Sequence, residues 1–136
     1  MRNFIIGYLS AALCMLALDI VWLSATAQPL YRNLLGDLLR PDFNLAPAII
    51  FYGLYVFGIV WFAVLPALTA GQWTTALLNG ALLGLVAYGT YDLTNQATLA
   101  RWSTTITIVD LCWGTFLTAL AATAGYFGAR AFAAAN

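Results

Sequence analysis

Three residue types are absent from this 136-residue sequence: lysine, glutamate and histidine. Without histidine the chain cannot build a histidine-ligated haem or zinc site or a Ser-His-Asp triad. Without lysine it cannot form a Schiff base with retinal or pyridoxal phosphate, and it has no Walker A lysine. We therefore expect no cofactor and no metal site. Any polar chemistry must use Asp, Arg, Tyr, Trp, Asn, Thr, Ser or Cys.

Charge is scarce as well: charged residues make up 7% of the chain and hydrophobic residues 63%. A soluble domain carries about 25% charged residues, so the composition is that of a membrane protein. A membrane-spanning helix needs about 20 mostly apolar residues, and four stretches qualify: 4–27, 46–68, 74–96 and 103–127. The sequence predicts an all-α integral membrane protein. Its four transmembrane helices would form an up-down bundle, with residues 1–136 as a single transmembrane domain.

The first apolar stretch shares some features with a signal peptide. It is longer than the roughly 7–15-residue core of such a peptide, and it contains Asp19, so we expect it to be retained as a span. After it, residues 29–40 place Leu34, Leu35, Leu38 and Leu39 at helical spacing between two prolines. This pattern favours a short amphipathic helix in the membrane interface. A solvated loop remains the alternative, because the segment is short and contains a glycine.

Small residues spaced by four occur on the third predicted helix, at Ala76, Gly80 and Gly84. This spacing lets two helices approach closely. Because four helices with short loops must already pack on each other, we expect packing within the chain rather than a dimer interface. The two cysteines, Cys14 and Cys112, lie inside predicted spans, where we expect them to act as small apolar residues without a disulfide.

Three of the five aspartates, Asp19, Asp92 and Asp110, fall inside predicted spans. An ionisable residue there costs roughly 2.5–3.5 kcal/mol on insertion scales and indicates a functional site. From the helical rise of 1.5 Å per residue, each lies roughly 7–12 Å from the same side of the bundle. The sequence therefore predicts one acidic layer beneath the first and third loops.

Aromatic and polar side chains share this layer. An Asp-x-x-Trp pattern occurs twice, at Asp19/Trp22 and Asp110/Trp113, and each pair shares one helix face. The predicted ligand-binding residues are Asp19, Trp22, Tyr52, Tyr55, Tyr88, Asp92, Asn95, Asp110 and Trp113, with Arg32, Arg40 and Arg101 at the rim. The alternative is a hydrogen-bond network that only holds the four helices together.

Several short runs of this sequence resemble the domain-of-unknown-function 2177 family of small bacterial membrane proteins. The most specific run is Tyr91-Asp-Leu-Thr-Asn95, and the other runs that carry the resemblance lie at 18–23, 51–55, 62–68 and 109–114. The resemblance implies a multi-pass protein of the bacterial inner (cytoplasmic) membrane with four helices. It implies no established activity.

Three functions are compatible with this pattern. The first is binding or transport of a lipid-like or cationic amphiphilic small molecule in an acidic and aromatic pocket, with membrane lipid around it and a homodimer if it is a transporter. The second is a lipid-modifying enzyme in which Asp92 and Asp110 act as acid and base and Asn95 orients the substrate. The third is an accessory subunit of a membrane complex. No nucleic-acid partner is expected.

Overall fold

The computed structural model describes residues 2–134, and every element in that range is helical. The helices cover all four predicted apolar stretches, which confirms the all-α prediction. In chain order the elements are α1 (Arg2–Thr26), the π-helical turn η1 (Ala27–Arg32), α2 (Asn33–Leu35), the 3-10 turn η2 (Gly36–Leu38), α3 (Leu45–Ile59), the π-helical turn η3 (Val60–Val64), α4 (Leu65–Ala70), α5 (Trp73–Thr98) and α6 (Thr104–Ala134).

Within residues 2–134, three helical stretches are long and apolar enough to cross a membrane: Arg2–Leu38, Leu45–Ala70 and Thr104–Ala134. The 26-residue α5 is long enough but less apolar. Its second half carries hydroxyl residues, and Thr90 and Thr98 donate hydrogen bonds to carbonyls of their own helix, at 2.7 and 2.8 Å. The fourth span therefore stays a prediction.

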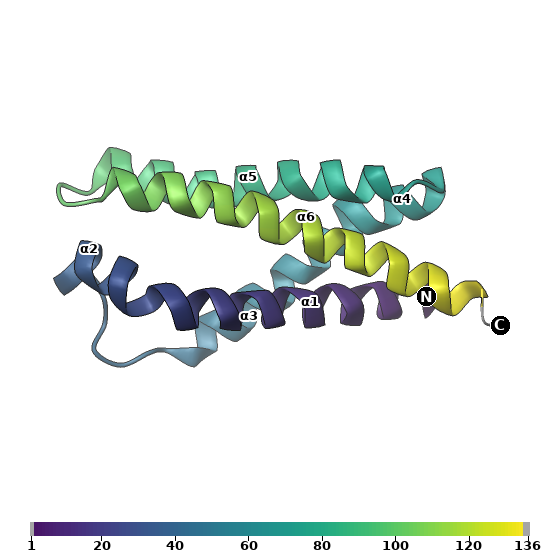
Figure 1. The fold of residues 1–136 in the computed structure, drawn as a ribbon, viewed down its shortest axis with the longest axis horizontal. Helices are drawn as coiled ribbons and strands as arrows, with labels where there is room; N and C mark the ends of the chain where they lie inside the picture. The colour runs from purple at the N-terminus through teal and green to yellow at the C-terminus, as the bar shows by residue number, and fades with distance from the viewer. Residues whose placement is uncertain (1, 135–136) are drawn as a thin grey trace.

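The segment predicted as a separate interfacial helix continues directly from α1. Pro29 has no N–H to donate to the preceding turn, and such a gap in the hydrogen-bond ladder is a common cause of a bend. Here the chain widens into η1, and Figure 1 shows the turns from η1 to η2 leaving the α1 axis toward the end of the α5–α6 pair. Gly36, at φ +48°, then breaks the regular helix. Whether the segment lies in a membrane interface stays a prediction.

A second proline interrupts the next helical stretch. Pro66 cannot donate to the carbonyl of Phe62, the residue four positions earlier. The side-chain amide of Asn79 on α5 donates to that carbonyl instead, at 3.0 Å. The π-helical turn η3 lies at the same place. The interruption thereby ties α5 to the α3–η3–α4 stretch.

The pair formed by α5 and α6 runs side by side in opposite directions (Figure 1). A Cβ atom on Gly84 would lie 2.2 Å from the carbonyl oxygen of Gly114, and one on Gly80 would lie 2.8 Å from the Cβ of Ala122. The backbones are therefore in direct contact. This confirms that the small residues of the third predicted helix pack within the chain.

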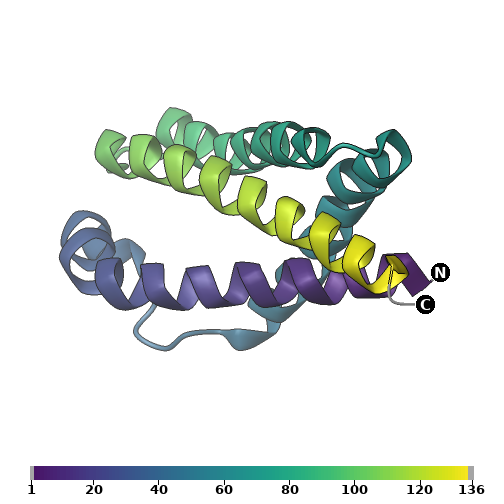
Figure 2. The same cartoon turned by 45° about the vertical axis from the view of Figure 1, so that its right-hand side comes forward.

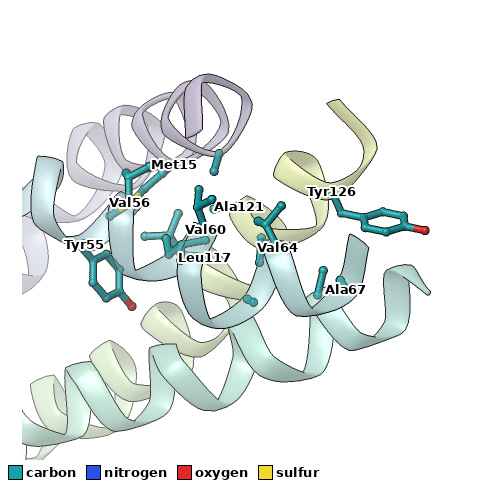
Figure 3. Packing of buried hydrophobic residues seen from close by; sticks show 14 residues of the cluster. Met15, Tyr55, Val56, Val60, Val64, Ala67, Leu117, Ala121 and Tyr126 are labelled. Atoms are coloured by element: carbon teal, nitrogen blue, oxygen red, sulfur yellow. The ribbon is translucent and has the colours of Figure 1, made fainter. Parts of the chain in front are cut away.

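The buried apolar core joins α1, η3 and α6. Figure 3 shows Met15, Val60, Leu117 and Ala121 meeting there, and all four are fully buried. From this core toward the end that carries both termini, α1 and α6 lie close together; toward the other end they separate (Figures 1 and 2). Cys14 and Cys112 are free thiols, as predicted.

Candidate functional site

Asp19 is a hydrogen-bond acceptor from two other helices. The hydroxyl of Tyr52 on α3 donates to its Oδ2, and the indole Nε1 of Trp113 on α6 donates to its Oδ1 at 3.1 Å. The carboxylate is 8% exposed, so both bonds form away from bulk solvent. Hydrogen bonds to a buried carboxylate are among the stronger polar contacts in proteins. Asp19 therefore connects α1, α3 and α6.

In the two Asp-x-x-Trp patterns, each tryptophan is linked to the aspartate of the other pattern. Trp22 and Trp113 stack with ring centroids 4.3 Å apart and planes 8° from parallel. Trp22 does not donate to the aspartate of its own pattern; its Nε1 donates to the hydroxyl of Tyr31 at 3.1 Å, and Tyr31 donates to Asp110. Each indole N–H thus points toward the carboxylate of the other pattern, directly to Asp19 or through Tyr31 to Asp110.

Asp92 differs from the other two buried aspartates. Its side chain is 0% exposed, and neither carboxylate oxygen has a hydrogen-bond partner among the described residues. The carboxylate of Asp110 lies within electrostatic range. A buried polar atom without a partner is costly and requires an explanation. Asp92 therefore lies outside the hydrogen-bond network of Asp19 and Asp110.

The remaining predicted pocket residues lie around this network. Tyr55 turns toward the core and shares a hydrogen bond of 2.7 Å with Thr118. The Tyr88 ring covers Gly114, where a Cβ atom would lie 2.2 Å from it. Asn95 is half-buried near the end of α5, where its backbone carbonyl accepts from Leu99 at 2.8 Å. The structure therefore does not bring the Asn95 side chain into the network.

A cavity of about 710 Å³ opens beside the network, between the η1–α2–η2 segment and the ends of α5 and α6. This volume falls within the roughly 300–1,000 Å³ of small-molecule sites. Its wall is mostly apolar and includes Leu23, Leu35, Leu39, Phe43 and Ile106. Asp110 and Tyr31 connect the cavity to the network, because both line it.

The three predicted rim arginines have different positions. Arg32 and Arg40 line the cavity, whereas Arg101 is exposed and does not. Arg101 forms no hydrogen bond or ion pair with any residue in the described range 2–134. Asp19 and Asp92 do not line the cavity either. Of the three aspartates, Asp110 alone contacts it.

No three side chains of the metal-binding types (histidine, cysteine, aspartate or glutamate) come close enough together to hold a metal ion anywhere in the described range 2–134. Asp19, Asp92 and Asp110 therefore do not form one such group. The site is built instead from two carboxylates with aromatic donors, and from a cavity that one of these carboxylates reaches.

The family model described as "Predicted membrane protein (DUF2177)" matches residues 4–127. The chain belongs to this family. No curated protein and no solved structure matches the chain. The DUF2177 segment contains the whole hydrogen-bond network and every residue that lines the cavity.

The DUF2177 motifs and the acidic layer pointed to most of the network but not to Tyr31. On a regular helix, nine residues turn the side chain by about 180°, which would place Tyr31 opposite Trp22. The π-helical turn and the bend after Thr26 bring the two side chains back together. Helical spacing therefore carried no signal for this residue. Its place beside Arg32 in an amphipathic segment was the only available sign.

Proposed function

We propose that this DUF2177 protein crosses the bacterial inner membrane with four helices and binds a lipid-like amphiphile in the cavity beside Asp110. The observation that carries the proposal is the lining of the cavity. Apolar side chains such as Leu35, Phe43 and Ile106 make up most of its wall, and charged groups such as Arg32 and Arg40 also line it. An amphiphile combines the same two kinds of group, an apolar chain and a polar head.

The position of the cavity supports this proposal. It lies where the chain after α1 turns toward the end of the α5–α6 pair, so the cavity is at the end of the bundle and not in the packed core. Membrane lipid is present at high concentration around such a protein. An amphiphile could enter from the bilayer without crossing water, and the four-span topology would place the mouth near the lipid headgroups.

The hydrogen-bond network would serve this site by positioning its wall. Tyr31 belongs to the cavity lining and is held by both Trp22 and Asp110. Trp22 is in turn stacked on Trp113, which is bonded to Asp19. Asp19 and Asp110 then have a positioning role, because their hydrogen bonds hold the bent segment against α6.

Two neighbouring leucines provide the test. Leu35 lines the cavity, whereas Leu34 is 41% exposed and does not. The purified protein is released from mild detergent in a native mass spectrometer, and the fraction that retains bound lipid is measured. The L35W variant should retain at least several-fold less lipid than the native protein, because the indole fills the site; the L34W variant should match the native protein.

Circular dichroism of the two variants confirms that both are folded before the comparison is made. Equal lipid retention by folded L35W and L34W proteins would show that the cavity is not the binding site.

A further inference from the structure

We infer that the head group held in this cavity is an anion of the phosphate type, bound by Arg32 and Arg40. This inference rests on the proposed function and adds the charge class of the ligand. It differs from the expectation drawn from the sequence, in which three aspartates favoured a cationic amphiphile as readily as a lipid.

The two arginines are available to a ligand. Both line the cavity, and neither forms an ion pair or a hydrogen bond with any residue that the structure describes. A guanidinium presents several N–H donors in a planar fork that matches the oxygens of a phosphate or carboxylate. Two such groups on the wall of a mostly apolar cavity form an anion site that the protein itself leaves unfilled.

The carboxylates are less available to a cation. Asp19 and Asp92 do not line the cavity. Asp110 does, but it is 8% exposed and accepts a hydrogen bond from Tyr31. Asp42 is the one exposed carboxylate among the lining residues. Two unpaired cations therefore face one exposed carboxylate, and the balance favours an anionic head group.

The apolar wall identifies the source of the anion. A free phosphate ion would leave Leu35, Phe43 and Ile106 in contact with water. A phospholipid would cover them with its chain while its phosphate reaches the arginines. Covering this apolar wall removes it from water, which is favourable, so the chain adds affinity that inorganic phosphate lacks. The shared chemistry is the phosphate group, and the test separates its two sources.

The experiment is a competition for the full-length protein in neutral detergent. Short-chain phosphatidic acid and diacylglycerol of equal chain length, which lacks the phosphate, are added in equal amounts, and the bound species are counted by native mass spectrometry. The native protein should prefer phosphatidic acid about tenfold, the effect of one charge-assisted hydrogen bond. The double variant R32Q/R40Q should lose this preference. The matched control is R101Q, which removes an arginine at the same end of the molecule but outside the cavity, and it should keep the preference.

The outcomes separate this inference from the proposed function. If the native protein binds both lipids equally, or if R101Q loses as much preference as R32Q/R40Q, the anion site is wrong while lipid binding stands. If inorganic phosphate alone displaces phosphatidic acid completely, the lipid source is wrong. If neither lipid binds, the proposed function itself fails. A preference for an alkyltrimethylammonium amphiphile over both lipids would overturn the charge class.

Discussion

The helix α6 packs against its two main neighbours in opposite ways. Against α5 it presents small residues, and the backbones touch: a Cβ on Gly84 would lie 2.2 Å from the Gly114 carbonyl oxygen. Against the second half of α1 it presents Trp113, whose ring stacks on Trp22 at 4.3 Å. Large rings hold those two helices apart, and Figure 2 shows them separating toward the same end. Close packing on one side and aromatic spacing on the other leave room for the cavity between the end of α1 and the α5–α6 pair, and not between α5 and α6.

The α5–α6 and α1–α6 contacts also differ in the interactions that stabilise them. The α5–α6 contact depends on shape and tolerates no added volume. In the second half of α1, the contact with α6 depends on hydrogen bonds to carboxylates, and these must be satisfied because the groups are buried. Substitutions that add volume should damage the first contact, and substitutions that remove an acceptor should damage the second.

The largest effect is expected at Gly84. In G84A the new methyl group meets the Gly114 carbonyl oxygen, so the two helices must move apart; overpacking of this kind costs about 1–3 kcal/mol and occasionally more. The matched control is G58A on α3, where nothing lies within 4 Å of the new Cβ. Thermal unfolding in detergent should show a much lower midpoint for G84A and no loss for G58A. Similar midpoints for the two variants would contradict the close α5–α6 contact.

A smaller loss is expected at Asp19. Replacement by alanine leaves the Tyr52 hydroxyl and the Trp113 indole N–H without their acceptor, at a cost of about 2 kcal/mol. The D19N variant keeps one side-chain oxygen as an acceptor and should lose less. Unfolding midpoints measure the order, and near-ultraviolet circular dichroism reports the Trp22–Trp113 stack, which should weaken in D19A. An unchanged aromatic spectrum in D19A would show that Asp19 does not hold the stack.

The smallest effect on stability is expected at Asp92. Because its carboxyl group is fully buried and has no partner among the described residues, replacing it with an amide breaks no hydrogen bond and removes an ionisable group from the interior. The D92N variant should be as stable as the native protein or more stable by up to about 1 kcal/mol. The same unfolding assay checks this. A loss as large as that of D19A would mean that Asp92 has a partner in the membrane-embedded protein.

Much of the α5–α6 side could be predicted from the sequence, because it depends on residue size at fixed spacing. Gly80 and Gly84 occur one helical turn apart, and this is enough to identify a close contact. The helical ranges followed from continuous apolar runs in the same way. The helix α5 was the exception: it forms as expected but is less apolar than the other three long stretches. Its threonines donate their hydroxyls to carbonyls of the same helix.

The α1 side could be predicted only in part. The repeated Asp-x-x-Trp pattern and Tyr52 pointed to the layer, but spacing along one helix could not show that each tryptophan turns toward the other pattern. Tyr31 depends on the π-helical turn at Ala27–Arg32, which changes the register of the helix. The absence of a hydrogen-bond partner for the Asp92 carboxylate among the described residues depends on which side chains the neighbouring helices bring to it. These features arise from contacts between helices, which a single sequence does not contain.

The most direct test of the binding site is photocrosslinking with a phospholipid that carries a diazirine in its acyl chain. The native protein is reconstituted in vesicles that contain this lipid, and the crosslinked residues are mapped by mass spectrometry. The account predicts adducts on both walls of the cavity, at Leu35 or Phe43 on one side and at Tyr91 or Ile106 on the other. Adducts confined to outward-facing residues such as Leu13 and Leu54, which are 70% and 69% exposed, would contradict it.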